Sequence, residues 1–148
     1  MRATPPPCIL VVEDSDEDFD TAHEAAQAAR LPHTVLRAAT GRECLALLRA
    51  ENGHGMHPAL VLMDLNLPDV DGHDALQAIK ADAALRHLPV VVLSTSGNAR
   101  DIEFCYRMGA NAFHSKPIRY EEHLALLRTI FAYWLRSVAL TQRRENSL

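Results

Sequence analysis

The residues of this chain that could do chemistry stand at the ends of short apolar runs. Glu13 and Asp14 follow the first run, Asp64 follows the second, Ser94 ends the third, and Lys116 comes shortly after the fourth. Such runs, separated by segments of helical period, are typical of central strands in a parallel sheet. Ligands bind at the carboxyl ends of these strands. We therefore expect three carboxylates, a hydroxyl and an ammonium to converge on one edge of the sheet, as a site for a divalent cation and a transferable phosphoryl group.

The three carboxylates indicate a metal ion. Carboxylates that lie close together repel one another and raise each other's pKa unless a cation is present. Mg²⁺ suits Glu13, Asp14 and Asp64, because it prefers oxygen ligands and keeps several waters. The plainer alternative is that Asp14 only caps the following helix and Asp64 only begins a turn. Neither alternative explains the whole set, so the pattern favours a Mg²⁺ site.

Asp64 is the candidate nucleophile, because a carboxylate can attack phosphorus and hold an acyl phosphate. Lys116 would bring a compact positive charge to one phosphoryl oxygen, and Ser94 would donate its hydroxyl to another. The plainer alternatives are a solvated surface lysine and a strand-end hydroxyl bonded to local backbone. The first fits Lys116 poorly, because this residue lies between a strand and Pro117. Pro117 is a candidate for a cis peptide bond that would aim the lysine.

The elements that must position these residues alternate between strands and helices. The pattern predicts strands over 8–13, 33–38, 59–63, 90–93 and 112–114. A helix is expected after each strand, and the last helix is expected to reach as far as residue 140. This alternation with right-handed crossovers predicts an α/β fold. It is a doubly wound, five-stranded parallel sheet of flavodoxin-like order 2-1-3-4-5, with helices on both faces.

Size and composition fit one soluble domain. The chain has 148 residues, 48% of them hydrophobic, so it can bury a full core without disulfides. A formal net charge of -4 gives little support to nucleic-acid binding, and no run is long enough to span a membrane. We expect a cytoplasmic protein. Its parts would be a Pro-rich lead over 1–7, a single domain over 8–140 and a flexible tail over 141–148.

The last helix carries an apolar stripe at helical spacing. A helix of about 20 residues is about 30 Å long, which is longer than one sheet face requires. Exposed aromatic anchors often mark an interface, so the stripe predicts a homodimer through this helix. The alternative is that the end of the chain folds back on its own core. The candidate interface residues are Leu127, Phe131, Trp134, Leu135 and Val138.

Taken together, these motifs resemble the receiver domains of two-component response regulators. Glu13-Asp14, Asp64, Ser94 and Lys116-Pro117 stand in the family's order and spacing, over about residues 9–127. The combination is far more specific than any one motif. The run that begins at Ser94 and the aromatic last helix look most like stand-alone regulators paired with bacterial phytochromes.

The resemblance implies a role for each residue. Asp64 would be the phospho-acceptor, and the Asn66 backbone carbonyl would join Glu13, Asp14 and Asp64 in the Mg²⁺ site. Ser94 would be the switch hydroxyl and Phe113 the switch aromatic. The expected partners are a sensor histidine kinase, for which a bacteriophytochrome is the candidate, and a downstream protein that reads the switched surface. The chain would catalyse only its own phosphorylation and dephosphorylation, so it would not be an enzyme acting on a separate substrate.

Two other functions stay open at this point. A phosphate sink with no output partner would have the same site residues. A Mg²⁺-dependent phosphohydrolase that forms an aspartyl phosphate would use a related α/β sheet. Phosphohydrolases of that kind need a second aspartate two residues after the nucleophile, and here that position is Asn66, which cannot act as an acid or base.

Overall fold

The computed structural model describes residues 7–49 and 56–141 and confirms the predicted fold. Five parallel strands form one sheet in the order β2-β1-β3-β4-β5. The predicted Pro-rich lead, apart from Pro7, and the predicted tail after Thr141 lie outside the described residues. The elements follow one another as β1 (Cys8–Val12), α1 (Asp16–Ala28), β2 (Thr34–Ala38), α2 (Gly41–Leu48), β3 (Leu60–Met63), α3 (Gly72–Ala81), β4 (Val90–Ser94), α4 (Ala99–Met108), β5 (Ala112–Ser115), α5 (Tyr120–Ala132) and the π-helical turn η1 (Tyr133–Ser137).

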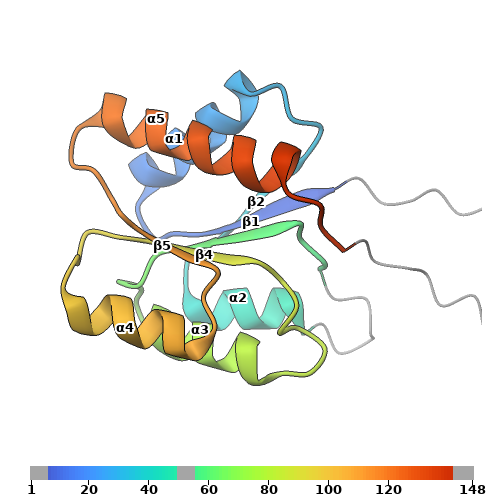
Figure 1. Ribbon diagram of the computed structural model, residues 1–148, viewed down its shortest axis with the longest axis vertical. Coiled ribbons are helices and arrows are strands. Elements are labelled where there is room, and N and C mark those ends of the chain that lie inside the picture. The colour runs from blue at the N-terminus through green and yellow to red at the C-terminus, as the bar shows by residue number, and fades with distance from the viewer. Residues whose placement is uncertain (1–6, 50–55, 142–148) are drawn as a thin grey trace, which may run out of the picture.

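Helices cover both faces of the sheet, as Figure 1 shows: α1 and α5 lie on one face, and α2, α3 and α4 lie on the other. Successive strand residues point to opposite faces. In β1, Ile9 and Val11 therefore pack under α1 and α5, while Leu10 and Val12 pack under the other three helices. The central strands are buried on both faces, which explains why their sequences read as unbroken apolar runs rather than alternating ones.

The strand register brings the ends of distant segments together. Val12 is the partner of Met63, so Glu13 and Asp64 leave neighbouring strands side by side. Ser94 is the partner of Ser115, so Lys116 follows at the same edge. Among the described residues, no helix is both long enough and apolar enough to cross a membrane.

Local capping signals fix where the helices begin and end. Ser15 caps α1 by accepting a hydrogen bond from the Asp18 backbone N–H. Thr40 caps α2 in the same way, through the backbone N–H of Glu43. Gly109 ends α4 with a φ of 104°, the left-handed conformation that favours glycine.

The C-terminal segment differs from the expectation in two ways. It ends its helical course at Ser137, short of residue 140. The assignment of Leu127 and Phe131 to a dimer interface is also wrong, because both side chains are fully buried against the sheet. Trp134 and Leu135 are half-buried and pack against the same cluster. A helical stripe can face a core or a partner, and here its first half faces the core.

The burial of Phe131 gives a direct test of this correction. We expect Phe131→Ala to lower the free energy of unfolding by about 3–5 kcal/mol, because it removes a fully buried aromatic ring and leaves a cavity. Urea unfolding followed by circular dichroism measures the loss. The control is Tyr133→Ala, whose side chain is more than half exposed, and which should change the free energy by about 0.5 kcal/mol or less. Equal effects of the two substitutions would contradict the packing described here.

Candidate phosphorylation and metal site

An acidic cluster forms where β1 and β3 end. Glu13, Asp14 and Asp64 each offer a carboxylate oxygen, and these oxygens lie within 4.8 Å of one another. Glu13 and Asp64 are buried, whereas Asp14 is exposed. A set of hard oxygen donors on two neighbouring strands fits a divalent cation such as Mg²⁺. The predicted convergence of the three carboxylates is therefore present. The Asn66 backbone N–H donates to Asp64 Oδ1 at 3.1 Å, and the ligand role of the Asn66 carbonyl stays a prediction.

Lys116 reaches the same cluster from the end of β5. Its Nζ donates to Glu13 Oε1 at 2.7 Å and to Asp64 Oδ2 at 3.1 Å. The Lys116 side chain is only 5% exposed, so the alternative of a solvated surface lysine is wrong. An ammonium this close to Asp64 can neutralise negative charge that is added at that carboxylate.

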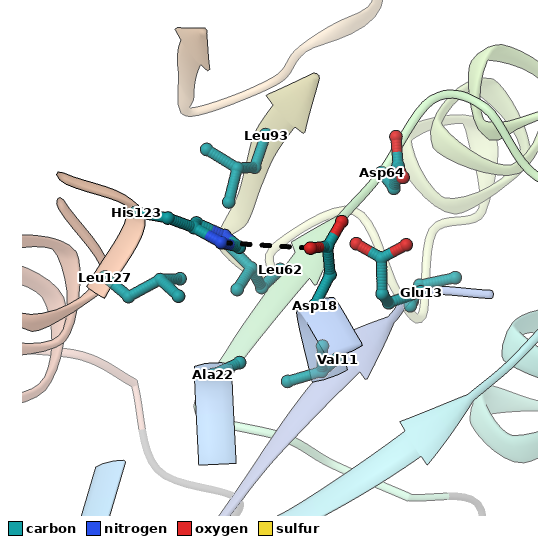
Figure 2. Close-up of a pocket in the computed structure, with 10 residues that line it drawn as sticks. Val11, Glu13, Asp18, Ala22, Leu62, Asp64, Leu93, His123 and Leu127 are labelled. Carbon is teal, nitrogen blue, oxygen red and sulfur yellow. Dashed lines mark ion pairs between the residues drawn. The ribbon is translucent and has the colours of Figure 1, made fainter. Parts of the chain in front are cut away.

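Asp18 is a fourth carboxylate in the site, and the sequence reasoning missed it. Its Oδ2 accepts a hydrogen bond from Lys116 Nζ at 2.9 Å. Figure 2 shows Asp18 on α1 beside Glu13, with His123 of α5 on its other side, where Nδ1 lies 3.9 Å from Asp18 Oδ1. The helix period could have placed Asp18 one turn after Asp14, but it could not have shown the contact with Lys116, which is 98 positions away along the chain.

Burial sets the ionisation of these groups. Desolvation and the nearby charge of Asp64 raise the pKa of Glu13 to about 7, although the hydrogen bond from Lys116 opposes this shift. Burial by itself lowers the pKa of Lys116, but its hydrogen bonds to Asp18 and Glu13 outweigh burial and raise it. Lys116 therefore stays charged at neutral pH. Burial is the largest cause of the raised pKa of Glu13, and the charge of Asp64 adds to it.

Backbone contacts, and not a cis peptide bond, aim Lys116. All peptide bonds of the described residues are trans, so the prediction for Pro117 is wrong. The Lys116 backbone N–H donates to the Ser94 carbonyl at 2.7 Å, which extends the β4–β5 ladder by one residue. The three carboxylates then hold the ammonium, and the ordinary trans isomer, which is favoured before proline, is sufficient.

Comparison with known proteins agrees with this geometry. Residues 9–128 match the family of response regulator receiver domains. The chain belongs to this family. It is 33% identical over 141 residues to the response regulator Rcp1 of Synechocystis sp. (strain ATCC 27184 / PCC 6803 / Kazusa), which covers 94% of this chain and 96% of Rcp1.

Solved receiver structures share the fold and much of the sequence. The Mn²⁺-bound form of Rcp1 has a TM-score of 0.87 at 32% identity, covering 93% of this chain and 100% of that chain. The phosphorylated cyanobacterial phytochrome response regulator RcpA also has a TM-score of 0.87, at 35% identity, covering 93% and 99%. The bacteriophytochrome response regulator AtBRR has a TM-score of 0.71 at 33% identity, covering 98% and 100%. The expected likeness to regulators of bacterial phytochromes is therefore confirmed.

Two candidate switch residues of this receiver lie close to the site. Ser94 is fully buried, and its Oγ accepts a hydrogen bond from the Ser96 backbone N–H at 3.1 Å, so local backbone does satisfy this hydroxyl. Phe113 is half-buried and packs against the cluster under α2, α3 and α4. Its backbone N–H donates to the hydroxyl of Tyr106, which is half exposed on α4. Phe113 therefore occupies a position between a core aromatic and a solvent-facing one.

His73, in the first turn of α3, links Asp71 in the preceding loop to Asp101 at the start of α4. His73 Nδ1 donates to Asp71 Oδ1 at 2.8 Å, and His73 Nε2 donates to Asp101 Oδ1 at 3.1 Å. Carboxylates accept and do not donate, so two such partners require protons on both ring nitrogens. Burial opposes this charge, but the hydrogen bonds to Asp71 and Asp101 outweigh it and raise the pKa of His73.

The raised pKa predicts a pH-dependent contribution to stability. The contribution is fully present below the unfolded pKa of about 6.5 and is lost as the pH rises through the higher folded pKa. We expect His73→Gln to lower the free energy of unfolding more at about pH 5.5 than at about pH 9. Urea unfolding at the two pH values measures this, with His23→Gln as the control for changing a histidine elsewhere. A cost of His73→Gln that is the same at both pH values would contradict the assignment.

Proposed function

We propose that this receiver accepts a phosphoryl group on Asp64 from a sensor histidine kinase, in a Mg²⁺-dependent reaction, and then switches conformation to signal to a protein partner. The observation that carries the proposal is the meeting of Asp64 with Lys116, 3.1 Å apart, inside an acidic cluster at the carboxyl edge of the sheet. A buried carboxylate with an ammonium on one side and further carboxylates on the other suits phosphoryl transfer, which depends mainly on positioning and charge neutralisation.

The chemistry assigns one task to each side chain. A carboxylate oxygen of Asp64 attacks phosphorus, the P–O bond forms, and the P–N bond to the kinase histidine breaks with its electron pair returning to the imidazole nitrogen. Lys116 compensates the charge that arrives on the phosphoryl oxygens. Glu13 and Asp14 would hold Mg²⁺ together with Asp64, and the bound ion would supply further charge neutralisation.

The change of charge at Asp64 would reach the surface through Ser94 and Phe113. A phosphoryl group adds strong acceptor oxygens, to which the Ser94 O–H would donate, whereas in this structure the Ser94 Oγ accepts from the Ser96 backbone N–H. Ser94 ends β4, and Phe113 lies on the neighbouring strand β5, opposite Val92. Movement of Ser94 would therefore change the packing next to Phe113. The surface formed by α4, β5 and α5 would then differ between the two states, and a partner could read that difference.

The relatives suggest the kind of kinase. RcpA and AtBRR are described as a phytochrome and a bacteriophytochrome response regulator, and both match more than nine-tenths of this chain. We infer that the partner kinase of this receiver is a phytochrome-type sensor. Likeness in sequence supports this pairing, and a panel of purified sensor kinases would test it by their relative phosphorylation rates.

The assignment of Asp64 as phospho-acceptor predicts that a substitution at this position abolishes phosphorylation. We expect Asp64→Asn to abolish phosphorylation while leaving the fold intact, because an amide cannot form the acyl phosphate. Intact-protein mass spectrometry after incubation with a small acyl-phosphate donor and Mg²⁺ measures the adduct, and circular dichroism checks the fold. Wild type with the Mg²⁺ chelated by EDTA is the control for metal dependence. An acid-labile phosphoryl group retained on Asp64→Asn would end the assignment.

We further propose a homodimer through the end of the chain, now restricted to η1 and the residues that follow it. Trp134, Leu135 and Val138 are half-buried, and Tyr133, whose ring meets that of Trp134 edge-on, is 56% exposed. This leaves an aromatic edge available to a second copy of the chain.

Removal of the Trp134 ring should weaken such a dimer. We expect Trp134→Ala to shift the protein from dimer to monomer at micromolar concentration, as measured by size-exclusion chromatography with light scattering. The substitution also removes packing against the core, so Phe131→Ala serves as the control for lost stability without a lost interface. A dimer that Trp134→Ala leaves unchanged would contradict this interface.

A further inference from the structure

Asp18 stands outside the acidic cluster and yet is bonded to its lysine. It lies in the first turn of α1, where its backbone N–H donates to the Ser15 cap at 3.3 Å. The cap fixes the backbone of this turn at the edge of the site. From there the carboxylate reaches Lys116 Nζ at 2.9 Å. Hydrogen bonds between ions at this distance belong to the strong class.

The three partners of Lys116 are not equivalent. Its ammonium has three N–H donors, and Glu13, Asp18 and Asp64 each accept from it. Glu13 and Asp64 also belong to the cluster suited to a cation, so their oxygens have a second use. Asp64 is in addition the proposed phospho-acceptor. Asp18 has neither role, and so it is the one carboxylate of the three that can keep its bond to Lys116 throughout the reaction.

The surroundings of Asp18 favour that bond over others. A small cavity between α1, α5 and the sheet is lined on the far side of Asp18 by His123 and by apolar side chains, among them Leu93 and Leu127 (Figure 2). His123 is only 5% exposed, and burial lowers its pKa, so at neutral pH it is an uncharged neighbour of Asp18. An uncharged imidazole 3.9 Å away does not compete with the Lys116 ammonium for the carboxylate.

We propose that Asp18 is a positioning residue for Lys116, which holds the ammonium where it meets the phosphoryl group arriving at Asp64. This inference rests on the proposed function. In this role Asp18 bonds neither to phosphorus nor to the metal ion, and it acts only through the lysine. Its effect should therefore appear in the rate of phosphorylation and should vanish when Lys116 is absent.

The test compares substitutions of Asp18 in two backgrounds. Phosphorylation of the full chain by a small acyl-phosphate donor at saturating Mg²⁺ is followed by intact-protein mass spectrometry, in the wild-type and in the Lys116→Ala background. We expect Asp18→Asn to slow phosphorylation about tenfold in the wild-type background, as the loss of one charge-assisted hydrogen bond would, and to have no effect in Lys116→Ala. Asp18→Glu, which keeps the charge, should restore most of the rate.

The matched control is Asp20→Asn, which makes the same charge change on the exposed side of the same helix. It should leave the rate unchanged, and isothermal titration should give Asp18→Asn a Mg²⁺ affinity close to that of wild type. Asp18→Ala, which keeps a good helix former at this position, replaces Asp18→Asn if that variant does not fold. Equal slowing by Asp18→Asn in both backgrounds, or a wild-type rate in that variant, would overturn the proposal.

The proposed function is judged separately in the same assay. A phosphorylated wild type and an inert Asp64→Asn support that function whatever Asp18 does. If wild type takes up no phosphoryl group, or Asp64→Asn still takes one up, the function itself fails. A normal rate in Asp18→Asn beside an inert Asp64→Asn counts against Asp18 alone.

Discussion

The site depends on one buried ammonium that is shared among carboxylates. Lys116 is 5% exposed and bonds to Glu13, Asp18 and Asp64. Removing an ammonium from water costs several kcal/mol unless good partners replace the water, and crowding carboxylates is equally unfavourable without a cation. The buried ammonium and the crowded carboxylates are thus stable here only because each compensates the charge of the other. Because the carboxylates outnumber the lysine, the site keeps an excess of negative charge that a divalent cation would offset.

Close backbone packing is what brings these charges within reach of one another. The parallel register of β1 and β3 sets Glu13 beside Asp64, and the backbone bond of Lys116 to the Ser94 carbonyl sets its direction. The start of α3 also packs closely against the loop that begins at Asp64, since a Cβ at Gly72 would lie 2.4 Å from the Asp64 carbonyl oxygen. Only glycine fits there without moving that loop. Gly72 is thus needed for the close approach of α3 to Asp64, and not for the flexibility of the chain.

The sequence was sufficient for the features that repeat along the chain. Buried strands read as apolar runs, and parallel strands bring their carboxyl ends to one edge, so the fold and the meeting of Asp64 with Lys116 could be predicted. Features that depend on a single side chain meeting another far along the chain could not. Asp18 lies on a polar helix turn with no motif, and the contact between His73 and Asp101 joins residues 28 positions apart. The stripe on α5 was ambiguous for a different reason, because periodicity marks an apolar face without saying what covers it, and Phe131 proved to face the core.

The hydrogen bonds around the loop after β4 determine how easily this loop could move in the proposed switch. Ser94 Oγ holds the Ser96 backbone, Ser96 Oγ in turn donates to Asp101 Oδ2, and Asp101 is bonded to the charged ring of His73. Asn66 adds a second link by donating to Thr95 Oγ1 at 3.4 Å. Converting a population almost completely needs about 5.5 kcal/mol of difference between the states. A neutral hydrogen bond contributes only about 1 kcal/mol, and one to a charged group contributes about 1.5–3 kcal/mol. The bonds with charged partners therefore contribute most to the stability of the loop conformation seen here. Any rearrangement of this loop that moves Asp101 would therefore have to break its contact with His73, which lies outside the candidate site.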